Sequence, residues 1–143
     1  MNKKTKNIIE WIIGAIMVVA IAYGTPMALS KILDTEYPIA SITSSSMWPA
    51  LKKGDIVFIK NVDKSELEIG DIVIYRNEKG FTIHRITELN EETLRTKGDA
   101  NNVSDRPIKY EEVVGKAVEW NNKPFRIPYF GKISIWRSGT GNF

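Results

Sequence analysis

The sequence predicts a mainly β protein in which a single N-terminal transmembrane helix is followed by a small antiparallel β-barrel or sandwich domain. Two observations support this prediction. A long apolar stretch lies near the N-terminus, and the rest of the chain carries short apolar runs separated by turn residues. With 143 residues in total, the chain has room for one compact domain beyond the helix and not for two.

The apolar stretch at residues 11–30 contains no charged side chain. A helix of this length, at about 1.5 Å per residue, spans the roughly 30 Å hydrocarbon core of a bilayer. Three lysines precede it, whereas both acidic and basic residues follow it, so the positive-inside rule places residues 1–10 in the cytoplasm. We therefore expect a single-pass protein of the cell membrane whose β domain, residues 34–143, is extracytoplasmic.

A cleavable signal peptide is the alternative interpretation of this stretch. Ala20-Ile21-Ala22 has the small-x-small form of a cleavage site behind a short apolar run. The apolar character continues past this site as far as Leu29, beyond the usual end of such a run. This favours a retained anchor.

Five runs rich in branched and aromatic residues are the predicted strands, and they span 55–60, 71–76, 81–87, 93–96 and 113–120. Residues 77–80 have the composition of a hairpin loop in which Gly80 can take a positive φ. Near the C-terminus, residues 125–136 mix aromatic and basic side chains. A final strand and a contact with lipid headgroups explain this segment equally well.

Composition excludes several classes of function. The chain has no cysteine, which removes disulfide frameworks, thiolate zinc sites and cysteine nucleophiles. Its 20 basic and 17 acidic residues give a nearly balanced surface without a basic stripe, so no nucleic-acid partner is expected. His84 is the single histidine, and chemistry that needs an imidazole must use it.

A cluster of hydroxyl side chains precedes the first predicted strand. By itself, such a cluster is usually a solvated turn. However, the string Ser44-Ser45-Ser46-Met47-Trp48-Pro49, followed by Lys53-Gly54-Asp55, resembles the nucleophile box of type I signal peptidases. Ile83-His84-Arg85 resembles the base-bearing box of the archaeal and endoplasmic-reticulum branch of that family, peptidase family S26 of the Ser-His-Asp type. Residues 96–102 and then Asp105 resemble its acidic box, and all three boxes occur in the family's order.

This resemblance implies a membrane-bound serine endopeptidase, a hydrolase that removes N-terminal signal peptides from secreted precursors. It implies that Ser46 is the nucleophile and that His84 is the general base. Elementary chemistry agrees, because a serine hydroxyl attacks a peptide bond only when a base within hydrogen-bond reach accepts its proton. It also implies the small antiparallel β domain of the signal peptidase type.

The resemblance assigns three supporting residues. Asp105 orients the imidazole, Asp99 is a supporting residue close to the site, and the Ser44 hydroxyl is a second donor to the oxyanion beside the backbone N–H of the nucleophile. Two positions depart from the family pattern, because Ser45 stands where glycine is common and Ala100 stands where asparagine is common. The departures bear on substrate preference and not on the class of reaction.

The expected partners are precursor proteins with signal peptides, the lipid bilayer and the protein translocation machinery, and no metal or organic cofactor is expected. The precursor should lie extended along a strand edge, with Ile42, Thr43 and the strands at 55–60 and 81–85 as walls of the groove. Two other functions stay open at this point. One is a related self-cleaving serine protease, and the other is a membrane-tethered β-domain adaptor without enzymatic activity.

Overall fold

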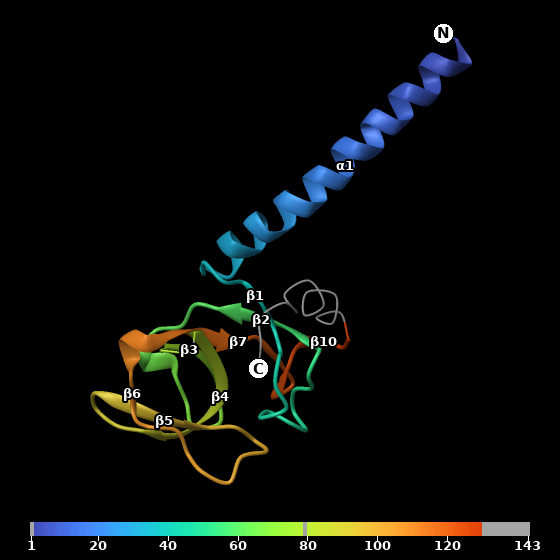
Figure 1. The fold of residues 1–143 in the computed structure, drawn as a ribbon. Helices are drawn as coiled ribbons and strands as arrows, with labels where there is room; N and C mark the ends of the chain where they lie inside the picture. Colours follow the sequence, from blue (N-terminus) through green and yellow to red (C-terminus); the bar gives the residue numbers. More distant parts are fainter. Residues whose placement is uncertain (1, 79, 130–143) are drawn as a thin grey trace.

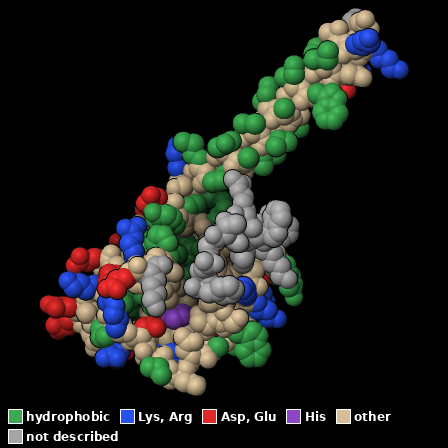
Figure 2. Space-filling model, in the orientation of Figure 1, with side chains coloured by type: hydrophobic (Ala, Val, Ile, Leu, Met, Phe, Trp, Pro, Cys, Tyr) green, Lys and Arg blue, Asp and Glu red, His purple; other side chains and the backbone are tan. Residues whose placement is uncertain are grey.

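The computed structural model describes residues 2–78 and 80–129 and consists of a long helix and a β domain (Figure 1). Helix α1 spans Lys3–Ile32 and therefore extends beyond the predicted stretch at both ends. None of its residues is buried, and Figure 2 shows apolar side chains along its length. Among the described residues, α1 is the one helix whose length and composition suffice to cross a membrane.

The β domain is an antiparallel sheet with a small additional hairpin. Its strands are β1 (Ile39–Ser41), β2 (Ile56–Lys60), β3 (Ile72–Asn77), β4 (Gly80–Leu89), β5 (Thr93–Lys97), β6 (Ile108–Lys109), β7 (Val113–Ala117), β8 (Glu119–Trp120), β9 (Lys123–Pro124) and β10 (Arg126–Ile127). The strands of the main sheet follow the order β1-β2-β7-β3-β4-β5-β6, β10 also pairs with β2, and β8 pairs with β9. Two short 3-10 helices, Lys64–Glu66 and Tyr110–Glu112, lie in the connections. The predicted fold class is confirmed.

Four of the five predicted strands correspond to single strands of the sheet, namely β2, β3, β4 and β5. The prediction of one strand over 113–120 is wrong, because β7 ends at Ala117 and β8 belongs to the separate hairpin. At the break, the N–H of Val118 bonds the carbonyl of Phe58, and its own carbonyl accepts from Phe125. The N–H of Val118 thus bonds strand β2, whereas its carbonyl bonds Phe125, which follows β9. Much of the aromatic and basic segment at 125–136 lies outside the described residues.

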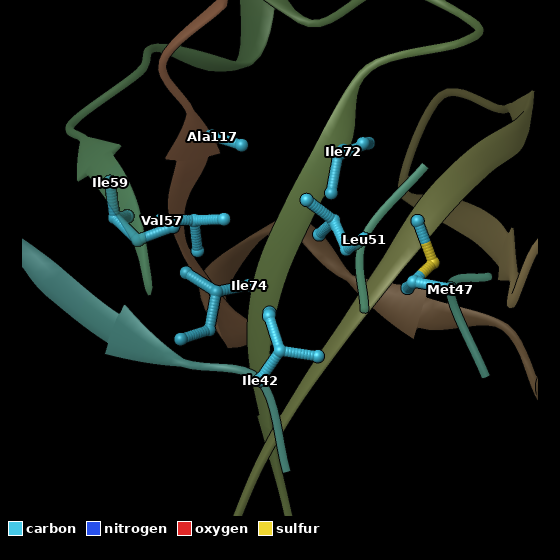
Figure 3. Packing of buried hydrophobic residues seen from close by; sticks show 8 residues of the cluster. All are labelled: Ile42, Met47, Leu51, Val57, Ile59, Ile72, Ile74 and Ala117. Carbon is cyan, nitrogen blue, oxygen red and sulfur yellow. The ribbon is translucent and has the colours of Figure 1, made fainter. Parts of the chain in front are cut away.

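Two hydrophobic clusters lie on opposite faces of β3. Ile72 and Ile74 belong to the first cluster, together with the buried residues in Figure 3, whereas Val73 and Tyr75 belong to the second. Side chains alternate between the two faces of a strand, so β3 reads as a continuous apolar run because both of its faces are buried. Strand β4 pairs with β3 along six positions and is thereby held on a rigid support.

Candidate active site

The candidate nucleophile lies in the loop between β1 and β2, and buried side chains fix this loop. Met47 and Leu51 are both buried and point into the first cluster (Figure 3). The base of the loop is closed by the buried carboxylate of Asp55, which accepts from the backbone N–H of Lys52 at 2.9 Å and from Arg126 Nη1 at 2.6 Å. Ser46 is therefore held in place by its direct neighbour Met47 while its own side chain remains partly exposed.

His84 lies in the middle of β4 and connects two side chains from distant loops. Its Nδ1 is 2.6 Å from Asp105 Oδ2, and its Nε2 is 3.1 Å from Ser46 Oγ. A carboxylate only accepts hydrogen bonds, so Nδ1 carries the proton and Nε2 is free to accept from the serine hydroxyl. The residue is only 7% exposed, and the histidine is visible in purple in Figure 2. The structure thus brings Ser46, His84 and Asp105 into one hydrogen-bonded row.

The two candidate aspartates lie on different sides of β4. His84 and Arg85 are consecutive residues of the strand, so their side chains point to opposite faces. Asp105 bonds His84, whereas Asp99 binds Arg85 through two parallel bonds of 2.8 Å, from Nε to Oδ1 and from Nη2 to Oδ2. This bonding with Asp99 raises the pKa of the Arg85 guanidinium, which stays charged.

Asp99 is nevertheless connected to the candidate nucleophile through the backbone of its own loop. The N–H of Ala100 donates to the carbonyl of Ser46 at 2.8 Å. A Cβ at Gly98 would lie 2.7 Å from the same carbonyl oxygen, so only glycine permits this close approach. The ion pair of Asp99 with Arg85 fixes this loop, and the loop in turn contacts the residue that carries the hydroxyl.

The Ser44 hydroxyl lies beside the candidate nucleophile. Its Oγ is 3.0 Å from Ser46 Oγ, and it accepts from the backbone N–H of Ser46 over a long 3.5 Å. A hydroxyl and a backbone N–H next to a nucleophile are the donors that an oxyanion needs. The geometry thus leaves Ser44 within reach of a group bound at Ser46.

A pocket of about 570 Å³ opens in front of Ser46 and His84. Its walls come from β1 with the segment that follows it, from β3 and from β4, and include Ile42, Thr43, Ile74 and Ile83. The expectation that residues 55–60 line the groove is wrong, because none of them borders this pocket. Strand β1 pairs with β2 and thus lies between β2 and the pocket.

The serine, the histidine and the carboxylate on a β domain define a chain of the serine-peptidase type. Residues 14–118 match the model of the peptidase S24-like family, and the chain belongs to that family. Two relatives are the signal peptidase complex catalytic subunit SEC11C of Homo sapiens and SEC11 of Lachancea thermotolerans. The first is 29% identical over 150 residues, covering 94% of this chain and 74% of the relative. The second is 34% identical over 128 residues, covering 77% and 71%. The predicted relationship to the signal peptidases is confirmed.

Two residues of the site were not predicted from the sequence. Arg85 stands next to His84 in the sequence, yet it is the ion-pair partner of Asp99. Thr96 is the first residue of the acidic box, and its hydroxyl donates to Asp105 Oδ2 at 2.7 Å. Alternation along β4 would have separated Arg85 from His84, whereas no local signal identifies the partner of a buried hydroxyl.

Proposed function

We propose that the protein is a membrane-bound signal peptidase in which Ser46, His84 and Asp105 hydrolyse the bond between a signal peptide and the secreted protein that follows it. The row from Ser46 Oγ through the imidazole to the Asp105 carboxylate, with its distances of 3.1 Å and 2.6 Å, is the observation that carries these roles. The printed name of the relatives, catalytic subunit of the signal peptidase complex, supports the substrate class.

The first half of the reaction uses the row in one direction. Ser46 Oγ attacks the scissile carbonyl carbon while His84 Nε2 accepts the hydroxyl proton. The imidazolium that forms keeps its Nδ1–H on Asp105, whose negative charge stabilises it. His84 then gives the Nε2 proton to the leaving amine, and the carbonyl carbon of the signal peptide remains as an ester on Ser46.

The second half repeats the same proton transfers with water. Water takes the place of the amine, His84 accepts its proton, and the hydroxide attacks the ester to release the signal peptide and restore Ser46. In both halves the carbonyl oxygen becomes an oxyanion, which the backbone N–H of Ser46 and the Ser44 hydroxyl stabilise. One such donor contributes about 3 kcal/mol in related chemistry.

The precursor binds as an extended strand in the groove between β1 and β4. Among the described residues, strand β1 is at the end of the sheet order, and extended peptides commonly bind proteins by adding a strand at such a sheet edge. Branched side chains of β3 and β4, Ile74 and Ile83, border the groove near the candidate nucleophile. Small substrate side chains next to the cleaved bond fit beside such walls.

Helix α1 anchors this site to the membrane that the precursor crosses. We assign residues 1–10 to the cytoplasm, 11–30 to the bilayer and 34–143 to the outside of the cell membrane, because basic residues precede the apolar stretch. The site then lies close to the membrane on the outer side, where a translocated signal peptide ends. The translocation machinery is accordingly a proposed partner, beside the precursors and the bilayer.

Incubation of the purified full-length protein in detergent with a precursor tests the proposal. The wild type should release one new product whose N-terminus, determined by sequencing, follows a small residue. Ser46→Ala should abolish this product, whereas Ser45→Ala should retain it, since Ser45 is an exposed neighbour outside the row. Unchanged processing by Ser46→Ala would contradict the proposed role of Ser46, whereas a wild type that releases no product would favour a role as a non-enzymatic adaptor.

A further inference from the structure

We propose that Thr96 is a positioning residue for the hydrolysis, and that its hydroxyl holds the Asp105 carboxylate toward His84. This inference rests on the proposed function of the row formed by Ser46, His84 and Asp105. The observation that supports it is a pair of hydrogen bonds between the two residues. Thr96 Oγ1 donates to Asp105 Oδ2 at 2.7 Å, and the Asp105 N–H donates to the Thr96 carbonyl at 2.8 Å.

The strand register places Thr96 on the side of the sheet that carries the imidazole. Thr96 of β5 pairs with Ile86 of β4, and Ile86 is two residues from His84, so all three side chains share one face. Thr96 is fully buried, with 0% of its surface exposed. A polar side chain at such a position needs a buried partner, and the Asp105 carboxylate is that partner.

Asp105 depends on this partner because it belongs to no strand. It lies in the irregular connection between β5 and β6, where the sheet does not fix its position. The two bonds to Thr96 attach both its backbone and its side chain to the end of β5. Because Oδ2 accepts from Thr96 and from His84 Nδ1 alike, the hydroxyl fixes the oxygen atom that orients the imidazole.

The charge around the carboxylate also favours this role. Among the described residues, His84 is the only basic side chain that forms a salt bridge with Asp105. The neighbouring Arg106 instead binds Glu112 at 2.7 Å. The Tyr75 phenol of β3 also lies near the carboxylate, and burial, with the nearby charge of Asp105, raises its pKa, so the phenol stays neutral. The neutral Thr96 hydroxyl holds the carboxylate without cancelling the charge that stabilises the imidazolium.

Replacement of Thr96 by valine tests the inference, because valine keeps the shape and removes the donor. Thr96→Val should lower kcat by about 10- to 100-fold, as expected for the loss of one hydrogen bond to a charged group, with KM within twofold. The rising limb of the pH–rate profile should move to higher pH. In this variant the Asp105 carboxylate accepts one hydrogen bond fewer than in the wild type. Its interaction with the protonated imidazole therefore becomes more favourable.

Two further variants separate positioning from mere packing. Thr96→Ser restores the hydroxyl and should bring kcat and the pH profile back to within threefold of the wild type. Thr87→Val is the matched control, since its hydroxyl bonds only the carbonyl of Arg95 at the exposed part of β4, and it should change neither. If Thr96→Val does not fold, as judged by its Tm, Thr96→Ala provides a second test. Alanine removes the same donor without placing a methyl group where the hydroxyl faced the carboxylate.

The outcomes distinguish this inference from the function on which it rests. An inactive Ser46→Ala beside a folded Thr96→Val with wild-type kcat and an unmoved pH profile would overturn the positioning role alone. A low kcat in both Thr96→Val and Thr96→Ser would overturn it as well, because the hydroxyl would then not matter. An active Ser46→Ala would overturn the proposed function itself.

Discussion

Exchange of Asp105 for asparagine tests the orienting role that the resemblance assigns to this residue. Asparagine keeps the size of the side chain but is neutral, and its NH2 group donates where the carboxylate accepts. At the Oδ2 position, an NH2 group would face two donors, Thr96 Oγ1 and His84 Nδ1–H. The imidazole would remove its donor–donor contact with this NH2 group by adopting the other tautomer. In that tautomer Nε2 carries the proton and cannot accept from Ser46.

The expected loss follows from that tautomer. The same exchange costs about 10⁴ in kcat in a well-studied serine protease. At about 1.36 kcal/mol per factor of ten, this corresponds to about 5.5 kcal/mol of transition-state stabilisation. We expect Asp105→Asn to lose kcat on this scale in cleavage of a purified precursor, with the Tm within a few degrees of the wild type, because the hydrogen bond of its backbone to Thr96 remains.

Asp99→Asn is the matched control, because it makes the same chemical change on the other face of β4. It leaves the Arg85 guanidinium without its charge partner, at a pair whose side chains are 31% and 17% exposed. We expect a stability loss of about 1–3 kcal/mol and a smaller loss of kcat through the loop that contacts Ser46. A stable but inactive Asp99→Asn, beside an Asp105→Asn enzyme within tenfold of the wild type, would refute the assignment.

Three further predictions concern the row, its base and the loop that carries the nucleophile. Ser46→Ala and His84→Ala should each lower kcat by about 10⁴ or more, with the double mutant little worse, whereas losses that multiply would show independent action. Because the proposed base is a histidine, kcat/KM should rise with pH below about pH 8, and a rising limb centred above that would indicate a lysine base. Arg126→Met leaves the buried Asp55 carboxylate without its cation, and calorimetry should find a free energy of unfolding lower by about 2 kcal/mol. An unchanged Tm would mean that this ion pair does not stabilise the loop.

The elements that depend on local sequence were the predictable ones. An uninterrupted apolar stretch marks α1, and alternating or continuous apolar runs with turn residues between them mark β2 to β5. The short strands β6, β9 and β10 have two residues each, which is too few for a periodic pattern. Strands β6 and β10 exist because β5 and β2, which lie earlier in the chain, supply their hydrogen bonds, and β9 forms a hairpin with the neighbouring β8.

The sequence by itself determined the class of the protein and pointed to two residues, Ser46 and His84, as candidates for its chemistry. The single histidine and the serine beside methionine stand in boxes whose order resembles one enzyme family, and this needs no coordinates. Only the tertiary structure identified Arg85 as the partner of Asp99 and Thr96 as a further partner of Asp105. Side chains alternate along β4, so His84 and Arg85 point to opposite faces, and the register with β5 puts Thr96 on the face of His84. Asp105 and Asp99 are only six residues apart, but the sheet lies between their partners, and such long-range pairing leaves no trace in local composition.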